Sequence, residues 1–228
     1  MFVIGDLHLS LGESEKPMDI FKGWENHARR IAQSWDENVK ETDTVIIPGD
    51  LSWAMNLDEA AEDFRFVQNR PGKKIILKGN HDYYWTTMKK MQEFLDANRF
   101  DTISILHNNS VLCEGVSICG TRGWMAENSD AFNKKIIERE AQRLETSLAS
   151  AKVGMPKLVF LHYPPFDREG KPILQLLNVL ERHQVSDCWF GHLHGQSIRT
   201  APVGTRGGIC YHLVSADALG FQPLKILL

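Results

Sequence analysis

Short apolar runs alternate along the chain with longer stretches in which apolar residues recur every three or four positions. Apolar runs of about four to eight residues are typical of buried strands, whereas the wider spacing is typical of amphipathic helices. This pattern predicts helices over residues 24–40, 57–69, 86–98, 130–152 and 172–184. It predicts strands over residues 2–5, 44–50, 73–80, 157–165 and 187–195.

The pattern changes after residue 100. Residues 103–124 are rich in β-branched side chains and contain Asn-Asn and Glu-Gly turn signals, which predicts two or three strands with an antiparallel hairpin. Residues 207–228 predict two closing strands. The alternation of strands and helices in the first hundred residues implies right-handed crossovers and a parallel sheet. We therefore expect an α/β fold in a single domain over residues 1–228, with a core of two sheets and helices outside.

Polar residues follow the apolar runs at five predicted strand ends. The residues at these ends are Asp6 and His8, Asp50, Asn80 to Asp82, His162, and His192 with His194. Four of the five groups come directly after a glycine. The carboxyl ends of parallel strands line the ligand crevice in open α/β sheets, so we expect these side chains to converge. We also expect Asp6 and His8 to point to the same side, and likewise His192 and His194, because residues i and i+2 do so in extended backbone.

The converging residue types indicate a metal centre. Carboxylate, amide and imidazole donors without a thiolate suit Mn, Fe or Zn better than a soft metal. The seven donors are Asp6, His8, Asp50, Asn80, His162, His192 and His194. Seven donors are too many for one tetrahedral zinc ion and suit two metals that share a bridging carboxylate. A solvated loop or a satisfied core histidine explains any one of these residues, but not five coincidences at strand ends.

Composition and charge narrow the classes of function. The 228 residues carry a formal net charge of −3, which gives no overall attraction to nucleic acid or to an anionic membrane. An acidic residue at position 6 argues against a signal peptide, and no apolar stretch is long enough to span a bilayer, so we expect a cytoplasmic protein. The four cysteines form no C-x-x-C motif, and we expect small buried side chains without disulfides.

The ordered motifs resemble the calcineurin-like metallophosphoesterase superfamily. These motifs are Asp6-x-His8, Gly49-Asp50, Gly79-Asn80-His81-Asp82, His162 and Gly191-His192-x-His194, and they extend over residues 5 to 195. The segment after Asp50 reads GDLSWAM rather than the Val-Asp-Arg-Gly continuation of the protein serine/threonine phosphatases. The chain is therefore more similar to the phosphodiesterase-like branch.

The resemblance implies a four-layer α/β/β/α sandwich with two mixed β-sheets and two divalent metal ions, with Mn preferred and Fe, Zn or Co as alternatives. By position, one metal would take Asp6, His8 and His194. The other would take Asn80, His162 and His192. Asp50 would bridge the two, and His81 would face the substrate as the catalytic residue.

The implied activity is hydrolysis of a phosphoester, either a diester or a monoester. Two divalent ions against two carboxylates leave a formal surplus of about +2, which attracts phosphate and lowers the pKa of a bridging water from 15.7 towards about 7. The resulting metal-bridged hydroxide would attack phosphorus, and His81 would protonate the leaving oxygen as a general acid. The substrate would be a small phosphoester, for which a nucleotide is one option, and we expect neither a membrane nor a nucleic acid as partner.

Three other functions stay open. A metal-binding interaction module of the same fold would have little turnover, although no predicted ligand is missing. A DNA exonuclease-like nuclease would need a basic groove, which the net charge does not favour. A mononuclear zinc hydrolase would leave several of the donors idle.

Further residues near the motifs are assigned as alternatives. Asp82 would either orient a neighbouring group or cap a turn, and Arg122 would either contact phosphate or form a surface salt bridge. Seven aromatic residues follow the motif loops and would form either a stacking rim for a base or, as we favour, ordinary packing: Trp53, Tyr83, Tyr84, Trp85, Trp124, Tyr163 and Phe166. The histidines expected to be surface or structural are His27, His107, His183 and His212.

Overall fold

A computed structural model describes residues 1–12, 17–125 and 131–227 of the chain. Its α-helices are α1 (His27–Asn38), α2 (Leu57–Gln68), α3 (Met88–Ala97), α4 (Ala131–Ala149) and α5 (Leu174–Arg182). Two short 3-10 helices, η1 (Met18–Ile20) and η2 (Gly195–Thr200), were not predicted. The five predicted helices are therefore confirmed to within a few residues, except that residue 130 lies outside the described residues.

The strands form two mixed sheets. The first sheet has the order β11-β1-β2-β3-β4, with β1 (Phe2–Val3), β2 (Thr44–Ile47), β3 (Lys73–Ile76), β4 (Ile103–Ile105) and β11 (Leu224–Lys225). The second has the order β5-β6-β7-β8-β10-β9, with β5 (Val111–Cys113), β6 (Val116–Thr121), β7 (Lys157–Leu161), β8 (Asp187–Phe190), β9 (Gly204–Arg206) and β10 (Ile209–Leu213). The predicted hairpin is β5–β6, and β9 was missed.

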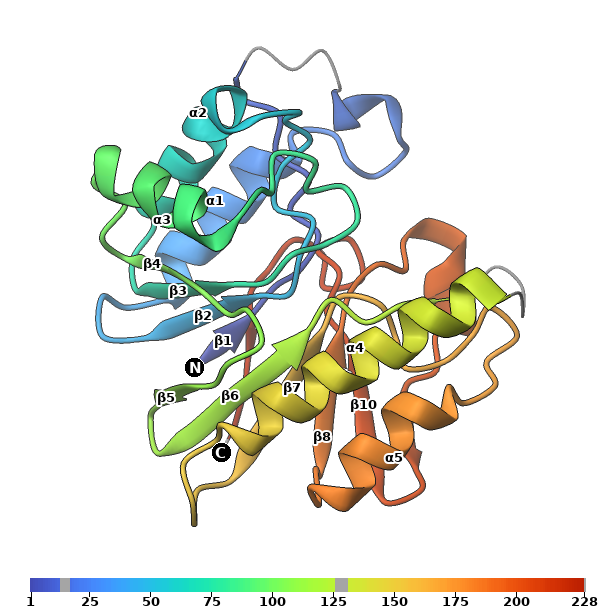
Figure 1. The fold of residues 1–228 in the computed structure, drawn as a ribbon. Coiled ribbons are helices and arrows are strands. Elements are labelled where there is room, and N and C mark those ends of the chain that lie inside the picture. Colours follow the sequence, from blue (N-terminus) through green and yellow to red (C-terminus); the bar gives the residue numbers. More distant parts are fainter. Residues whose placement is uncertain (13–16, 126–130, 228) are drawn as a thin grey trace.

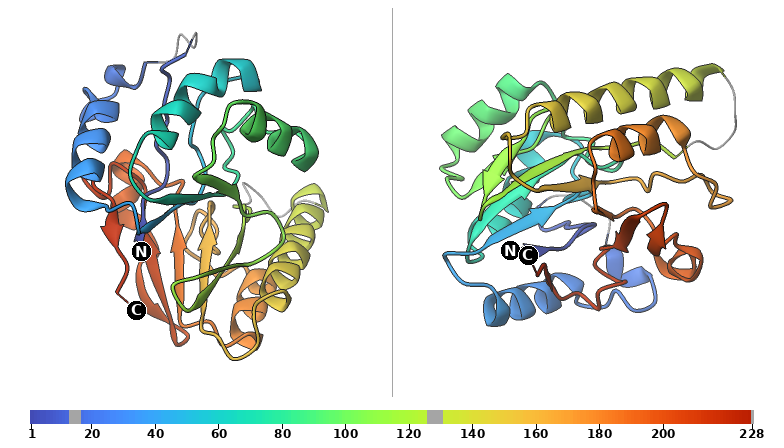
Figure 2. Two further views of the ribbon diagram at one scale, coloured as in Figure 1. Left: turned by 90° about the vertical axis from the view of Figure 1, so that its left-hand side faces the viewer. Right: turned by 90° about the horizontal axis from the view of Figure 1, so that it is seen from below.

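Three apolar clusters show that the layers are stacked α/β/β/α, as expected. One cluster joins α1, α2 and α3 to the outer face of the first sheet, and a second joins α4 and α5 to the outer face of the second sheet. The third lies between the sheets and includes Val3, Ile46, Phe160 and Trp189. Figure 1 and the left view of Figure 2 show α1 to α3 on one side of the molecule and α4 with α5 on the other.

Local sequence explains why these helices form where they do. In α2, Ala60, Phe64 and Val67 are buried at helical spacing, while Asn56 caps the helix by accepting a hydrogen bond from the Glu59 backbone N–H at 3.0 Å. Two acidic residues, Asp58 and Glu59, lie in its first turn, where they complement the helix dipole.

The strands end earlier than predicted, and this matters for the site. β2 ends at Ile47, β3 at Ile76 and β8 at Phe190, so the polar motifs lie in loops beyond the strands. The two sheets are linked at this end, where Gly5 pairs with Ser215 and the Gly5 N–H donates to the Val214 carbonyl at 2.7 Å. Motif loops from both sheets therefore meet at one place. Within the described ranges, no helix has the length and apolar character needed to cross a bilayer.

Candidate metal centre

Left-handed backbone, and not extended backbone, aims several motif side chains at the centre. Asp6 has φ 57°, His8 44°, Asp50 51° and His192 71°. The expectation that Asp6 and His8 converge through i, i+2 alternation was therefore wrong in its reason, although the two side chains do meet. Asp and His are among the residues that enter this region more readily than most.

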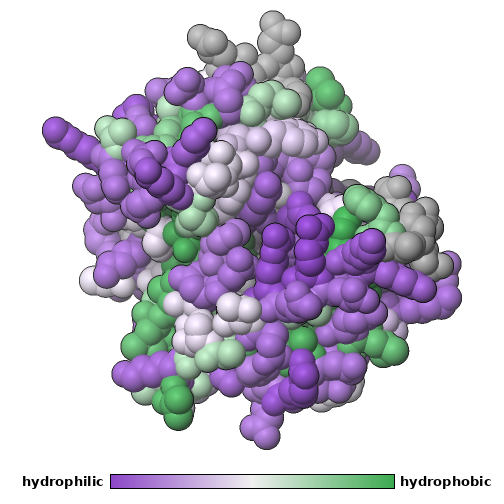
Figure 3. Space-filling model, in the orientation of Figure 1, coloured by the Kyte–Doolittle hydropathy of each residue, from purple (hydrophilic) through white to green (hydrophobic). Residues whose placement is uncertain are grey.

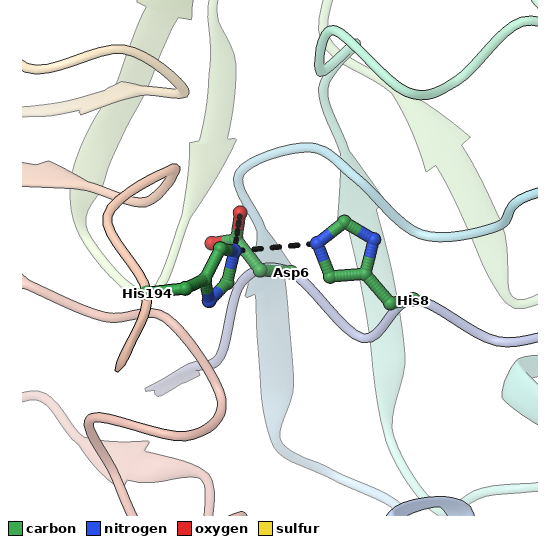
Figure 4. Close-up of side chains that lie close together, drawn as sticks. All are labelled: Asp6, His8 and His194. Atoms are coloured by element: carbon green, nitrogen blue, oxygen red, sulfur yellow. Dashed lines mark hydrogen bonds and ion pairs between the residues drawn. The ribbon is translucent and has the colours of Figure 1, made fainter. Parts of the chain in front are cut away.

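Asp6, His8 and His194 form the first group of possible ligands, whose donor atoms all lie within 4.8 Å of one another. His194 Nε2 lies 3.2 Å from His8 Nε2 and 3.2 Å from Asp6 Oδ1. Figure 4 shows His194 reaching Asp6 and His8 from a different segment of the chain. Asp6 is fully buried and also accepts a hydrogen bond from the His192 backbone N–H, which joins the β1 loop to the β8 loop.

Asp50, His162 and His192 form the second group. Asn80 belongs with it, because its Oδ1 lies 2.6 Å from His162 Nε2. Asp50 Oδ2 lies between the groups, at 3.5 Å from His162 Nε2 and 3.8 Å from His8 Nε2. The structure thus brings all seven sequence-predicted donors together, with Asp50 Oδ2 between the two groups.

The hydrogen bonds of the centre leave a gap that a cation would fill. Asp50 Oδ2 is buried and has no hydrogen-bond partner. The Pro48 carbonyl can only accept, so His162 donates from Nδ1 at 3.1 Å and keeps a lone pair on Nε2. That lone pair faces the lone pairs of Asn80 Oδ1. Opposed acceptors in a buried site are costly unless a positive charge lies between them, so these residues fit a bound divalent metal.

The pKa values of the groups in the centre also fit a bound cation. Burial raises the pKa of Asp50 well above its usual value, and the Asp82 and Asp6 carboxylates add to this effect. Burial lowers the pKa of His162 to about 3. Burial opposes protonation of His194 too, but the Asp6 and Asp217 carboxylates raise its pKa to about 10. Against the effect of burial, the neighbouring histidines lower the pKa of Asp6, so that carboxylate stays ionised. Without a cation, His194 therefore holds a proton and Asp50 resists ionisation at the place where a metal would supply positive charge.

Asp82 ties the loops together. Its two oxygens accept hydrogen bonds from the backbone N–H groups of Gly79, Asp50, Leu51 and Ser52 and from the Tyr84 hydroxyl, at 2.6 to 3.4 Å. The side chain is fully buried. Asp82 therefore caps a turn and also positions the Asp50 loop, which combines the two alternatives drawn from the sequence.

His81 lies beside the centre and is not part of either ligand group. Its backbone N–H donates to Asp50 Oδ1 at 2.8 Å, and its Nδ1 lies 3.2 Å from the Tyr83 hydroxyl. The Trp53 ring lies 4.3 Å from the His81 ring and stacks on His8 at 4.9 Å, measured between centroids. His81 is half-buried, which leaves it accessible from solvent next to the donors.

Asp217 is a site residue that the sequence reasoning missed. Its Oδ1 accepts a hydrogen bond from His194 Nδ1 at 2.9 Å, and its Oδ2 accepts one from the Gly195 N–H at 2.9 Å. A carboxylate on Nδ1 fixes the histidine tautomer so that Nε2 is free to ligate. The only signal in the sequence is an Asp shortly after the late strand at 209–213, which is too common a pattern to be decisive.

The remaining candidates divide into core and surface residues. Tyr84 and Phe166 are buried in the core, so they form no rim, whereas Tyr83 is exposed beside His81. His27 is buried against Trp24 and Phe221, and His107 is exposed. His183 lies 2.8 Å from a Glu145 oxygen, in keeping with a structural role.

The cysteines are free, but only two of them are buried. Cys119 and Cys188 lie in the core, while Cys113 and Cys210 are half-exposed, which corrects the expectation that all four are buried. Cys210 lies with Asp187 and His212 in a third cluster of metal-type donors, and His212 Nε2 is 2.9 Å from Asp187 Oδ1. Asp187 begins β8, so this cluster lies at the opposite end of that strand from the centre.

Arg122 follows β6 and lines a cavity whose lining includes none of the seven donors. Its backbone carbonyl accepts hydrogen bonds from the His162 and Tyr163 N–H groups at 3.1 and 2.9 Å. Its guanidinium lies 5.2 Å from the centre of the Trp124 ring, and its Nε is buried without a partner. Within the described residues Arg122 forms no ion pair, which disfavours the surface salt bridge.

Comparison with known proteins identifies a family whose model matches most of the chain. The family model of the calcineurin-like phosphoesterases matches residues 1–196. An uncharacterized metallophosphoesterase of Helicobacter pylori is 26% identical over 71% of this chain and 38% of its own length. The gene 66 protein of Mycobacterium phage L5 is 31% identical over 34% of this chain and 37% of its own length. The chain thus spans less than two fifths of these curated relatives.

Solved structures agree on the fold. The phosphopantetheinyl hydrolase of Mycobacterium tuberculosis superposes with a TM-score of 0.54 at 13% identity, covering 94% of this chain and 88% of that chain. The protein TT1561 of Thermus thermophilus superposes with a TM-score of 0.52 at 10% identity, covering 93% and 87%. At these identities the comparison concerns the arrangement of layers and strands.

Proposed function

Because the chain belongs to the calcineurin-like phosphoesterase family, we propose that it hydrolyses phosphoesters at a centre of two divalent metal ions. The observation that carries this proposal is Asp50 Oδ2, a buried oxygen without a hydrogen-bond partner that lies between His8 Nε2 and His162 Nε2. A single oxygen in that position can serve two metals, whereas a structural aspartate would be satisfied by donors of the protein.

The seven donors would divide between two metal sites. Asp6, His8 and His194 would hold one metal, and Asn80, His162 and His192 would hold the other. Asp50 would contact both. Oxygen and imidazole donors suit Mn²⁺, with Fe, Zn²⁺ or Co²⁺ as alternatives. When bound, the two metals supply the positive charge that attracts a phosphoester and the acidity that converts a water molecule into the attacking hydroxide.

The protein's own side chains supply orientation and a proton. Asp217 and the Pro48 carbonyl hold His194 and His162 by Nδ1, which keeps both Nε2 atoms directed at the centre. His81 would donate a proton to the leaving oxygen, because it is half-buried, lies next to the donors and has Trp53 and Tyr83 against its ring. General acids of this kind contribute about 10²- to 10⁴-fold to the rate.

Two measurements test the proposal. Elemental analysis after saturation with Mn²⁺ should give two ions per folded chain. Turnover should then appear in a panel of phosphodiesters, phosphomonoesters and nucleotides, with the ability to cleave diesters expected from the GDLSWAM segment after Asp50. One ion per chain would favour a mononuclear hydrolase, and two ions without turnover on any ester would favour a metal-binding interaction module.

The variant His81→Ala tests whether His81 is a general acid or a metal ligand. The variant should keep both metals and lose far more activity on alkyl phosphoesters than on p-nitrophenyl esters, whose leaving group hardly needs a proton. His183→Ala is the matched control, because that histidine lies away from the centre beside Glu145. An equal loss on both ester types would show that His81 is not the acid, and a loss of metal would make it a ligand.

A further inference from the structure

A cavity of about 470 Å³ lies where the ends of β3, β4 and β6 meet α4. Its lining is unusually rich in positive charge, contributed by Lys78, Arg122, Arg139 and Arg143, with Glu140 as the one acidic residue among the lining residues. In the orientation of Figure 1, strongly hydrophilic side chains gather in the middle of the face that Figure 3 shows, around the upper part of α4. The chain as a whole is slightly acidic, so this charge is local.

Glu140 does not neutralise the cavity. Its Oε2 accepts hydrogen bonds from the Thr121 hydroxyl at 2.6 Å and from the Gly123 N–H at 3.1 Å, and its Oε1 pairs with Arg143 at 2.5 Å. The charges of Glu140 and Arg143 therefore neutralise each other. Across the described residues, the side chains of Lys78, Arg122 and Arg139 have no hydrogen bond or ion pair to a protein group. About three positive charges therefore line the cavity without a carboxylate partner.

Two of these cations are partly removed from water. The Arg122 Nε is buried and has no partner, which is costly for a charged donor. Lys78 is half-buried and lines the same cavity as Arg122 and Arg143. An anion in the cavity would give the buried Nε–H a hydrogen-bond partner and would offset the repulsion between the cations.

The cavity is connected to the metal centre through the backbone. Lys78 comes two residues before Asn80, and the Arg122 carbonyl accepts hydrogen bonds from the His162 and Tyr163 N–H groups. The backbones of Lys78 and Arg122 thus adjoin those of Asn80 and His162. We propose that the cavity binds a second anionic group of the substrate, a phosphate or carboxylate separate from the phosphoester that is cleaved. This inference rests on the proposed function and narrows its substrate class to phosphoesters with an additional negative charge.

A pair of substrates that differ only in the extra charge provides the kinetic test. We would compare p-nitrophenyl hexyl phosphate with p-nitrophenyl 6-phosphonohexyl phosphate, which share the leaving group and the cleaved bond. The wild type should prefer the phosphono substrate by about tenfold or more in kcat/KM, and Arg139→Gln should remove most of this preference. Lys134→Gln is the matched control, because Lys134 is exposed on the same helix and does not line the cavity. No preference in the wild type, or equal preference in Arg139→Gln, would overturn the inference.

A free anion could occupy the cavity as an effector in place of part of the substrate. Free hexylphosphonate added to the hexyl substrate distinguishes the two. Inhibition or no effect is expected for a substrate site, whereas stimulation that Arg139→Gln abolishes would overturn the substrate assignment.

Calorimetry on metal-free protein separates this inference from the proposed function. Inorganic pyrophosphate should bind the chelator-treated protein, and Arg139→Gln should weaken that binding about fivefold or more while Lys134→Gln leaves it unchanged. If no ester is hydrolysed but this difference is present, the proposed function is wrong and the cavity is still an anion site. If pyrophosphate binds equally to all three proteins, the cavity inference is wrong whatever the enzyme hydrolyses.

Discussion

At the scale of single residues, the centre is assembled from side chains that the backbone holds in an unfavourable conformation. Asp6, His8, Asp50 and His192 all have positive φ, which costs roughly 1–2 kcal/mol for each residue that is not glycine. Such conformations persist when surrounding contacts determine them, and here the Asp82 carboxylate and the His192 N–H bond to Asp6 do so. The same contacts make it possible to separate metal binding from stability by mutation.

Asp50→Asn should mainly reduce metal binding, whereas Asp82→Asn should mainly reduce the stability of the fold. Asp50→Asn removes the carboxylate between the two sites, so metal content should fall from two ions to one or none, while the free energy of unfolding of metal-free protein changes little. Asp82→Asn puts an amide N–H₂ group where backbone N–H groups now donate, so unfolding should become easier by about 3 kcal/mol or more. Elemental analysis and urea denaturation measure the two effects. Equal metal loss and equal destabilisation in both variants would contradict these roles.

Asp217→Asn should weaken metal binding without removing a ligand. The carboxylate now holds His194 by Nδ1, and loss of such a partner typically costs about 10- to 100-fold in affinity. Competition with a fluorescent chelator measures the change. Asp187→Asn, which removes a carboxylate from a histidine at the other end of β8, is the control and should leave the affinity of the centre unaltered. An unchanged affinity in Asp217→Asn would show that His194 does not depend on this contact.

At the scale of elements, the short strands and the loops after them decide where the donors lie. The loops pass so close together that glycine is required at Gly79, where a Cβ would overlap the Asp50 carboxylate and its backbone N. Gly49 combines φ +95° with a similar contact, since its Cβ would lie 2.7 Å from His162 Nδ1. The Asp50 and Asn80 loops are therefore packed backbone against backbone.

Gly79→Ala should damage the centre from a position that carries no donor. The added methyl group has to displace Asp50, and overpacking of this kind costs about 1–3 kcal/mol. We expect metal binding to weaken along with stability, as measured by metal titration and by thermal unfolding. Gly154→Ala is the control, because a Cβ there meets open space and the cost is limited to the positive φ. Full metal binding in Gly79→Ala would contradict the close packing of the two loops.

At the scale of the whole molecule, the centre joins the two halves of the sandwich. Asp6, His8, Asp50 and Asn80 follow strands of the first sheet, and His162, His192 and His194 follow strands of the second. Each proposed metal would therefore be held by both sheets. A ligand that binds only the folded state stabilises it by about 2.7 kcal/mol at a concentration of 100 times its Kd.

Removal of metal should accordingly lower the melting temperature. For a chain of this size, about 2.7 kcal/mol corresponds to roughly 5–10 °C for one site, and a second site adds to it. Differential scanning calorimetry with and without a chelator measures the shift. Asp50→Asn should show little dependence on the chelator, whereas Lys134→Gln should behave as the wild type does. A wild-type melting temperature that is the same in both buffers would show that metals do not join the sheets.

The sequence by itself determined the layers and the donors. Periodicity located the five helices, the β-branched stretch located the hairpin, and the recurrence of Asp, Asn and His after apolar runs picked out all seven donors that the structure brings together. These signals are local, because a helix or a strand needs its apolar residues at a fixed spacing, and a motif needs its residues close together in the chain.

Only the tertiary structure decided how those donors meet. The left-handed backbone at Asp6 and His8 depends on contacts with the β2 and β8 loops, so no spacing rule could reveal it. Asp217 reaches His194 from a turn after β10, 23 residues away along the chain. The positively charged cavity combines Lys78, Arg122 and Arg139 from three separate elements. Contacts between distant segments depend on how the two sheets pack, and a linear pattern of residues does not record that packing.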